Sequence, residues 1–301
     1  MAVTPQVLYA DLPDASQTHI TFQDSTWAKT HGLTRSLPSP GEVRALFPGL
    51  GLHSFQKVAK FEELDLVVKF GDRVHVSEAI CLRTVKRLFS SQVPVPEVYG
   101  WRVEGHHVYL YMQLIRGPTL LERWPTMDYQ DKQSVCSHLH FILQALRSIK
   151  QDPSREFIGQ FLGGPSKDRI LEFKPSPEPA WTSVASFHNW LSWLWRRHAP
   201  EPNEIADPWR QLLDDNSPVV LTHGDLHRSN IIVSATSPVQ VVAIIDWEQS
   251  GWYPDYWEYC KTVYTVGDWE EWFSAGWISS ILTPQPSAEE AFEFYRGAIG
   301  R

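Results

Sequence analysis

A polar loop enclosed by apolar stretches constrains the fold of this chain more than any other feature. The loop, residues 223–230, follows the short apolar stretch 218–221 and precedes the apolar run 231–233. Aliphatic and β-branched residues on both sides predict two buried strands that hold the loop on a rigid base. A further apolar stretch, 241–245, predicts another strand, which ends at Asp246. The sequence therefore predicts a scaffold that presents polar side chains at strand ends.

Three oxygen-bearing side chains at these strand ends fit the chemistry of phosphoryl transfer. Asp225 and Asn230 are five positions apart, which is the Asp-x-x-x-x-Asn spacing of kinase catalytic loops. Such an Asp orients the attacking hydroxyl and takes its proton, while carboxylate and amide oxygens are ligands that magnesium prefers. The pattern predicts Asp225 as the catalytic residue, and Asn230 and Asp246 as metal ligands. Taken singly, each also has a structural explanation, as a turn cap, an Asx turn or a helix N-cap.

A lysine inside an apolar strand suggests how an anionic triphosphate is held. Lys69 stands between Val68 and Phe70, where a lysine would ordinarily point to solvent. The helix predicted to follow, over 74–90, carries Glu78 on its apolar stripe. The two residues together predict the ion pair that places a lysine on the α- and β-phosphates in kinases.

The order of the predicted elements indicates two lobes. The first lobe is a small sheet with one helix, and its predicted strands are 54–60, 65–70, 98–103 and 108–114. The second is mainly helical, with helices predicted at 128–149, at 187–198 and over the C-terminal part. We expect an α+β fold with a nucleotide-binding lobe at 1–115, a helical extension at 1–50 within it, and a catalytic and acceptor-binding lobe at 116–301. A ligand cleft is expected between the lobes.

These motifs resemble the aminoglycoside phosphotransferase and choline kinase-like family of the protein-kinase-like superfamily. The resemblance spans residues 50–265 and rests on His-Gly-Asp-Leu-His-Arg-Ser-Asn at 223–230 and Ile-Asp-Trp-Glu at 245–248. Further similar stretches are 67–70, 77–79, 93–96, 111–117 and 251–258. The resemblance implies a protein-kinase-like two-lobed fold, ATP or in some members GTP as donor, and Mg²⁺ as cofactor.

The resemblance also extends the set of expected site residues. It implies that Lys69 and Glu78 serve the phosphates, and that Gln113, Leu114 and Ile115 form the hinge whose backbone hydrogen-bonds adenine. The chain lacks a G-x-G-x-x-G pattern before Lys69, and the stretch 48–54 is the nearest candidate for a phosphate loop.

A cluster of acidic and aromatic residues beyond Asp246 is the candidate acceptor site. Carboxylates beside aromatic rings attract cations, so an amine-bearing or aromatic small molecule is the expected acceptor. The competing explanation is a helix beginning near Asp255, whose charge would favour the helix dipole. The expected acceptor residues are Glu248, Trp252, Asp255, Tyr256 and Glu258.

Bulk properties exclude several classes of protein. The formal net charge of −8 disfavours binding to nucleic acid, which selects basic surfaces. No apolar stretch approaches the length needed to cross a bilayer, and no secretory signal pattern opens the chain. Three cysteines without CxxC spacing predict neither disulfides nor a zinc knuckle, which favours a reducing, cytoplasmic location. The sequence does not indicate an oligomeric state.

Three functions fit these observations to different degrees. The first is a small-molecule O-phosphotransferase that moves the γ-phosphate of ATP to a hydroxyl. The second is a catalytically silent nucleotide-binding scaffold. It is disfavoured because the chain retains all five polar residues expected at a kinase site: Lys69, Glu78, Asp225, Asn230 and Asp246. The third is a protein kinase, which is disfavoured because Asp246 is followed by Trp-Glu-Gln-Ser-Gly and no Ala-Pro-Glu closes an activation segment.

Overall fold

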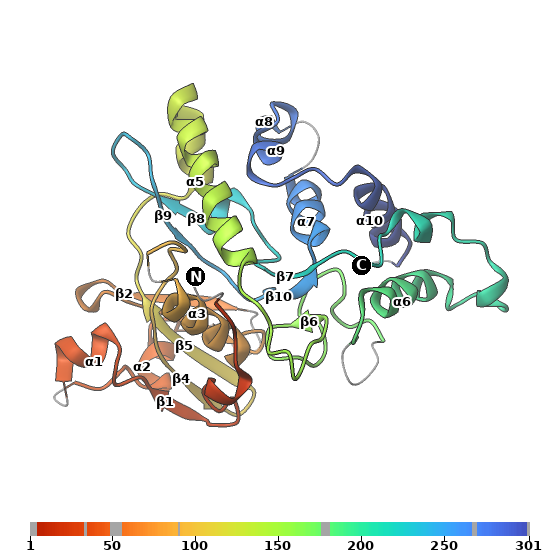
Figure 1. Ribbon diagram of the computed structural model, residues 1–301. Coiled ribbons are helices and arrows are strands. Elements are labelled where there is room, and N and C mark those ends of the chain that lie inside the picture. The colour runs from red at the N-terminus through yellow and green to blue at the C-terminus, as the bar shows by residue number, and fades with distance from the viewer. Residues whose placement is uncertain are drawn as a thin grey trace.

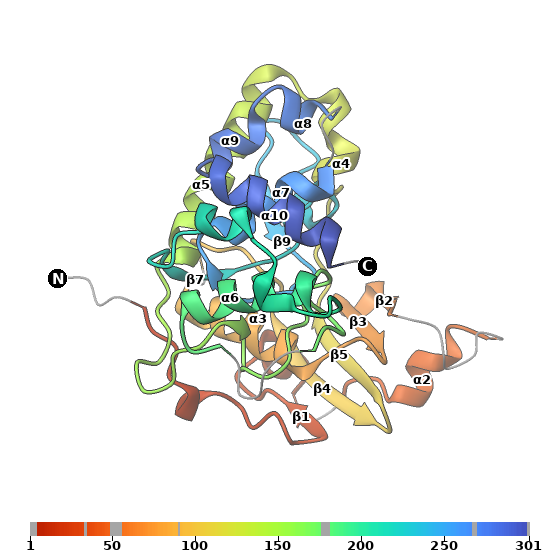
Figure 2. The same cartoon turned by 90° about the vertical axis from the view of Figure 1, so that its right-hand side faces the viewer.

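The computed structural model describes residues 5–32, 35–48, 56–89, 91–175, 181–266 and 270–299. They form two lobes. The lower lobe in Figure 1 contains an antiparallel sheet and its helices, and the upper lobe is mainly helical. A quarter turn shows the same stacking of the helical lobe over the sheet (Figure 2). The α+β, two-lobed architecture expected from the sequence is confirmed. The expected phosphate loop at 48–54 lies outside the described residues, apart from Pro48.

The smaller lobe is built on a five-stranded antiparallel sheet in the order β1-β4-β5-β3-β2. The four predicted strands are present as β2 Lys57–Phe61, β3 Leu66–Gly71, β4 Val98–Glu104 and β5 His107–Gln113. The predicted helix is α3, Val76–Leu88, and two short helices lie between β1 and β2 in the chain, α1 Thr26–His31 and α2 Pro40–Ala45. The edge strand β1, His19–Thr21, pairs with β4 and was not expected, because three residues carry no visible alternation.

Alternation along the central strands separates the two faces of this sheet. Leu66, Val68 and Phe70 of β3 pack with α1 and α2 in one apolar cluster. Lys69 projects from the opposite face, toward α3, and is only 3% exposed. The lysine that would ordinarily point to solvent is therefore turned into the molecule, because both faces of this strand are covered.

The larger lobe combines helices with three short antiparallel pairings. Its long helices are α5 Tyr129–Arg147, α6 Val184–Arg196, α7 Tyr256–Val266 and α10 Pro286–Ala298. Its shorter helices are α4 Leu120–Arg123, α8 Glu271–Ser274 and α9 Trp277–Ile281. Its strands are β6 Gly159–Gln160, β7 Val219–Thr222, β8 Ile231–Val233, β9 Val241–Ile244 and β10 Gly251–Pro254. The strand β10 lies between β6 and β7, and β8 pairs with β9.

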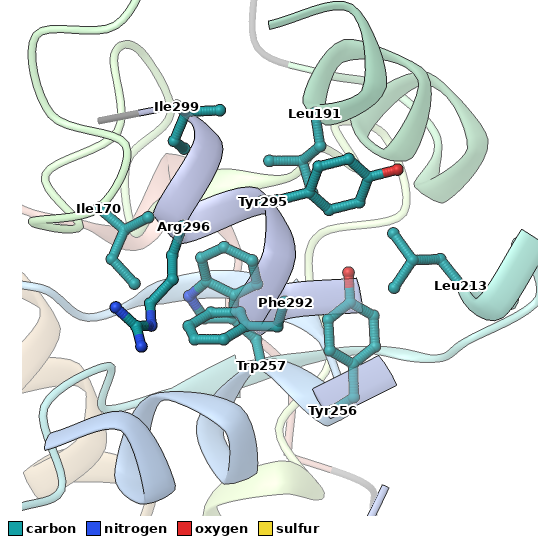
Figure 3. Close-up of a pocket in the computed structure, with 9 residues that line it drawn as sticks. All are labelled: Ile170, Leu191, Leu213, Tyr256, Trp257, Phe292, Tyr295, Arg296 and Ile299. Atoms are coloured by element: carbon teal, nitrogen blue, oxygen red, sulfur yellow. The ribbon is translucent and has the colours of Figure 1, made fainter. Parts of the chain in front are cut away.

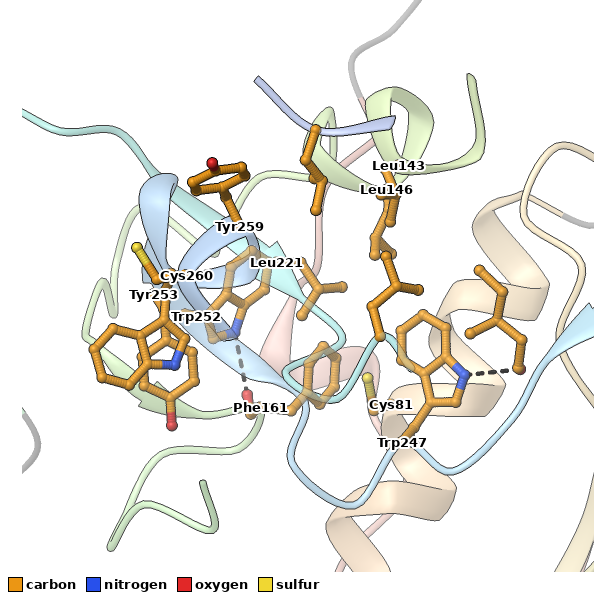
Figure 4. Close-up of a cluster of buried hydrophobic side chains, with 14 of the residues drawn as sticks. Cys81, Leu143, Leu146, Phe161, Leu221, Trp247, Trp252, Tyr253, Tyr259 and Cys260 are labelled. Carbon is orange, nitrogen blue, oxygen red and sulfur yellow. Dashed lines mark hydrogen bonds between the residues drawn. The ribbon is translucent and has the colours of Figure 1, made fainter. Parts of the chain in front are cut away.

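The larger of two apolar clusters runs through both lobes. Figure 4 shows Cys81 of α3, in the smaller lobe, beside Trp247, which follows β9 in the larger lobe, and both side chains are buried. In the same cluster the indole of Trp252 donates to the carbonyl of Phe161 at 3.3 Å. This shared packing fixes the lobes relative to one another and so fixes the side chains that face the space between them.

Two further sequence expectations can be compared with the structure. The three cysteines, Cys81, Cys136 and Cys260, are buried and unpaired, as expected. Across the described ranges, every helix is too short or too polar to span a bilayer.

Helix α5 provides a test of the core. Leu139 is 0% exposed, whereas Phe141 on the same helix is 70% exposed. Leu139→Ala should lower the free energy of unfolding by about 2–5 kcal/mol, since it removes buried methyl groups and leaves a cavity. Phe141→Ala should change it by less than about 0.5 kcal/mol. Urea unfolding followed by tryptophan fluorescence measures both, and similar losses in the two variants would contradict the assigned orientation of the helix.

Candidate active site

The polar loop 223–230 is fastened to the larger lobe by a buried carboxylate. Glu258 of α7 accepts hydrogen bonds from the backbone N–H of His223 at 2.5 Å and of Gly224 at 3.1 Å. Gly224 has φ +79°, and a Cβ at this position would stand 2.6 Å from the carbonyl oxygen of Gln249. Only glycine adopts this turn without a clash, so the start of the loop is determined by close contact with the segment beyond β9.

His223 orients the loop from inside. Its Nε2 lies 3.0 Å from the carbonyl oxygen of Ile245, so it must carry the proton and donate. Its Nδ1 accepts from the backbone N–H of Asp225 at 3.2 Å. One ring therefore connects the loop to the end of β9 in a defined tautomer.

Asp225 and Asn230 form the reactive end of the loop. The Asn230 Nδ2 group donates to the Asp225 carbonyl oxygen at 2.9 Å and to its Oδ2 at 3.1 Å. The Asn230 Oδ1 atom faces only the hydroxyl of Ser229, at 3.4 Å. The Asp225 Oδ1 accepts no hydrogen bond from any residue in the described ranges. One oxygen of each side chain therefore stays available for a ligand.

Lys69 lies at the centre of a buried ion cluster. Its Nζ is 2.8 Å and 2.9 Å from the two carboxylate oxygens of Glu78, 2.5 Å from Asp246 Oδ1 and 3.3 Å from Glu248 Oε2. Burial alone would lower the pKa of Lys69, but the carboxylates of Glu78, Asp246 and Glu248 raise it above its usual value. The ammonium is therefore charged and holds together β3, α3 and the segment after β9.

The pKa values of Glu78 and Asp246, two carboxylates of this cluster, shift in opposite directions. Burial raises the pKa of Glu78 to about 7, although Lys69 opposes the shift. Burial also acts to raise the pKa of Asp246, but Lys69 outweighs it and lowers that pKa below the ordinary value. Asp246 is thus the carboxylate that remains anionic at neutral pH.

Asp246 is also conformationally unusual. Its φ is +66°, in the left-handed region that non-glycine residues rarely occupy. The backbone before it is held, since Ile245 N–H donates to the Asn230 carbonyl oxygen at 2.8 Å. Strain of this kind persists where the surroundings over-determine a side-chain position, and it is common at functional sites.

The predicted site residues converge on one cleft. A cavity of about 430 Å³ separates the sheet from the larger lobe, and Lys69, Glu78, Asn230 and Asp246 all line it. Its apolar walls include Val58, Val67, Leu82, Met112, Ile232 and Ile245. The sequence hypothesis required the side chains at 69, 225, 230 and 246 to meet in one crevice. Lys69, Asn230 and Asp246 line this cavity, and Asp225 is hydrogen-bonded to Asn230.

The expected hinge residues form one edge of the same cavity. Gln113, Leu114 and Ile115 all line it. The backbone N–H of Gln113 donates to Glu97 and that of Leu114 donates to Asp65. Ile115 N–H donates to none of the described residues. It is the one amide of the three that remains available to a ligand.

The expected acceptor residues are largely not available to a ligand. Trp252, Tyr256 and Glu258 are each at most 2% exposed, so the expectation that they contact an acceptor is wrong. Trp252 lies on β10, the middle strand of its sheet, which is paired with β6 on one edge and β7 on the other. Glu258 serves the backbone of the polar loop instead.

Tyr256 points into the core of the larger lobe. Figure 3 shows it beside Trp257, Phe292 and Tyr295 around a small, largely apolar cavity. Its hydroxyl is 2.9 Å from Nε2 of the buried His188. The aromatic residues beyond Asp246 therefore build the interior of the lobe, which is the alternative explanation for such a cluster.

The two remaining expected acceptor residues have partners within the protein. Glu248 is 11% exposed and binds Lys69 and Arg169. Asp255 is half-buried and accepts a hydrogen bond on its carbonyl oxygen from Arg147, at 3.0 Å. Glu248 therefore offers no unengaged carboxylate to an amine, whereas the bond from Arg147 does not involve the carboxylate of Asp255.

Arg169 is a residue of the site that the sequence did not reveal. Its Nη2 donates to Glu248 Oε1 at 2.8 Å, and its guanidinium is also electrostatically coupled to Asp225 and Asp246. It lies in the irregular segment between α5 and α6, far from the other site residues in sequence. No local pattern marks it, so only the fold reveals its place.

A family model matches most of this chain. The sequence model of the phosphotransferase enzyme family matches residues 59–286. The chain belongs to this family. No match is found among the curated proteins.

Solved structures of phosphotransferases share the fold. A thermostable mutant of the aminoglycoside phosphotransferase APH(4)-Ia, in a ternary complex with ADP and hygromycin B, aligns with a TM-score of 0.50 at 14% identity over 81% of this chain and 84% of that chain. The aminoglycoside phosphotransferase APH(3'')-Id from Streptomyces rimosus aligns with a TM-score of 0.47 at 16% identity over 81% of this chain and 92% of that chain. At 14% identity, the likeness to the APH(4)-Ia structure concerns the fold.

Glu258 provides a test of how this family member holds its polar loop. Glu258→Gln replaces an acceptor oxygen by an amide group that cannot accept from both N–H groups. The free energy of unfolding should fall by about 1–3 kcal/mol, the cost of leaving a buried donor unpaired. Glu290→Gln, an exposed change on α10, is the matched control. Thermal or urea unfolding measures both, and equal stability of the two variants would refute the anchoring role of Glu258.

Proposed function

We propose that this phosphotransferase moves the γ-phosphate of ATP to a hydroxyl of a small molecule, with Mg²⁺ as cofactor. The donor binds between the lobe at 1–115 and the lobe at 116–301. The observation that carries this proposal is the meeting of Lys69, Asn230 and Asp246 at one cavity that also has an unused hinge amide. A cation, two hard oxygen ligands and an adenine-sized apolar slot are the parts that phosphoryl transfer requires.

The nucleotide has a defined place in this proposal. Adenine lies between the apolar walls of the cavity, and Ile115 N–H donates to it. Lys69 reaches the α- and β-phosphates and is held in position by Glu78 at 2.8 Å.

The residues at the end of the cavity fit a magnesium ion. Asp246 supplies an anionic carboxylate, and Asn230 supplies an amide oxygen that accepts one long hydrogen bond, from Ser229 at 3.4 Å. Magnesium is bound in proteins through one or two such ligands together with phosphate oxygens. When bound, the ion neutralises charge that develops on the phosphate oxygens. Lys69 Nζ is 2.5 Å from Asp246 Oδ1, so Asp246 would hold the ion beside the lysine that contacts the phosphates.

Asp225 acts on the acceptor. Its Oδ2 is held by Asn230, and its Oδ1 is directed to no described donor, which leaves it for the acceptor hydroxyl. The hydroxyl oxygen forms a bond to the γ-phosphorus while the bond to the β–γ bridging oxygen breaks. ADP leaves with that electron pair, and the hydroxyl proton passes to Asp225.

The acceptor is a small molecule. Most of the side chains expected to bind an amine or aromatic group on it are buried or already paired within the protein. The aromatic side chains assigned to it are core residues, and Glu248 is engaged within the protein. The hydroxyl is therefore the one feature of the acceptor that the reacting groups themselves require.

Asp225→Asn tests the assignment of the base. The variant keeps the shape of the loop but cannot take a proton, so turnover should fall about 10²- to 10⁴-fold while ATP binding is retained. Transfer of label from γ-labelled ATP measures turnover, and thermal stabilisation by ATP with magnesium measures binding. Asp72→Asn, at an exposed position after β3, is the matched control. Wild-type turnover in Asp225→Asn would overturn the role of Asp225.

Lys69→Met tests the phosphate contact. It removes the charge that the triphosphate needs and leaves Glu78, Asp246 and Glu248 without their shared partner. Magnesium-dependent thermal stabilisation by ATP should be lost, whereas Lys29→Met on α1 should retain it. Loss of stabilisation in both variants, or in neither, would contradict this placement of the donor.

The same measurements distinguish an enzyme from a nucleotide-binding scaffold. Stabilisation by ATP together with transfer to at least one hydroxyl compound supports the proposed function. Stabilisation without transfer across a broad panel of hydroxyl compounds would favour the scaffold.

A further inference from the structure

A second large cavity lies in the smaller lobe, on the opposite face of its sheet from the cavity proposed for the nucleotide. Its volume is about 450 Å³. Tyr111 of β5 packs in the apolar cluster with α1 and α2, whereas its neighbour Met112 lines the nucleotide cavity. Arg102 of β4 lies over the Tyr111 ring, 5.5 Å from its centroid, and lines the second cavity. The two cavities share no lining residue, so the sheet separates them.

The floor of this second cavity is the β1 edge of the sheet. His19 of β1 pairs with Arg102 of β4, and residues paired in this way project from the same face. Thr21, two positions further along β1, is on that face as well. All three side chains line the cavity, so one strand pairing brings them together.

The roof consists of α1, the segment that follows it and the start of α2. Its apolar lining residues are Trp27, Ala28, Leu37 and Pro40. The hydroxyl of Tyr111 donates to the Pro38 carbonyl oxygen at 2.7 Å, and the ring centroids of Trp27 and Tyr99 are 5.7 Å apart. These contacts fasten the roof to the sheet, so the cavity is formed before a ligand arrives.

Arg102 brings a buried positive charge into this cavity. Its side chain is only 8% exposed. Its Nη1 donates to the carbonyl oxygens of Ile20 at 2.5 Å and Trp101 at 2.8 Å, and its Nη2 donates to Thr21 Oγ1 at 2.8 Å. Burial lowers the pKa of Arg102, and no carboxylate opposes that shift. Because a guanidinium has five N–H groups, one on Nη2 and the one on Nε have no acceptor among the described residues.

The cavity contains positive charge that the protein does not neutralise. Arg35, which is exposed, also lines it, and neither arginine forms an ion pair with any residue in the described ranges. Among those ranges, no aspartate or glutamate contributes to the lining. Burial, with Arg102 as a second cause, lowers the pKa of His19, so its imidazole is neutral at pH 7. A buried charge of this kind is costly until a counter-charge reaches it.

We propose that this cavity binds a small organic anion, in which a carboxylate or a phosphate is attached to a flat apolar group. The anionic group accepts from Arg102 and Arg35, since guanidinium groups bind either anion through paired N–H donors. The apolar group lies against Trp27 and Pro40 of the roof. The volume is within the range of small-molecule sites, and a few fixed polar groups in a partly apolar cavity are typical of them. The site is separate from phosphoryl transfer and does not depend on the proposed function.

Ligand-detected NMR with three matched probes tests the proposal. Phenyl phosphate, benzoate and benzyl alcohol share a phenyl ring and differ in charge, and saturation transfer to the ring protons of each probe measures its Kd. At least one of the two anions should bind at least about tenfold more tightly than benzyl alcohol, because a hydrogen bond to a charged group is stronger than one to a neutral group. The tighter anion identifies the ligand as a phosphate or a carboxylate. Equal binding of all three probes, or binding of neither anion, overturns the proposal.

Charge reversal at Arg35 assigns the binding to this cavity. Arg35→Glu should raise the Kd of the tighter anion at least about tenfold. Because Arg35 is exposed, the change does not disturb the core, whereas replacing Arg102 would also release β1. Arg87→Glu is the matched control, at an exposed position of α3 that lines neither cavity, and its Kd should equal that of the wild type.

A steric change provides a second test that leaves the charge unaltered. Ala28→Phe places a ring in the cavity from α1 and should also raise the Kd of the anion at least about tenfold. Thr30→Phe, at an exposed position of the same helix outside the lining, should leave it unchanged. Wild-type affinity in both Arg35→Glu and Ala28→Phe would show that the anion binds elsewhere and would refute the site.

Discussion

The ammonium of Lys69 is the interaction on which the arrangement of the site depends. It is buried, and it binds carboxylates from α3 and from the segment after β9, which belong to different lobes. A buried lysine without such partners would carry a large desolvation penalty, and so would the carboxylates without the lysine. The cluster therefore couples the position of the two lobes to the position of the reacting groups. Asp246, whose pKa is lowered by Lys69, supplies the negative charge that a divalent cation requires.

The rest of the larger lobe maintains this geometry through close backbone contacts. Glu258 holds the start of the polar loop, and Gly224 permits its approach to Gln249. His223 connects the loop to the end of β9, where Asp246 adopts its left-handed conformation. Each contact joins segments that are distant in sequence, so displacement of one would move several polar groups at once. Pre-organisation of this kind lets electrostatic effects act on the transition state without rearrangement.

The sequence predicted the parts of the site that have local signals. The spacing of Asp225, Asn230 and Asp246 at strand ends, and the stripe on the helix that carries Glu78, depend on neighbouring residues and periodicity. The residues from Trp252 to Glu258 were misinterpreted as an acceptor site. The sequence shows that acidic and aromatic residues lie close together there, but it does not show that the fold buries them. Placement of Trp252 between β6 and β7 is a long-range pairing, and so is the edge pairing of β1. Arg169 had no local signal, because its position depends on the Asp168–Lys261 pair across the lobe.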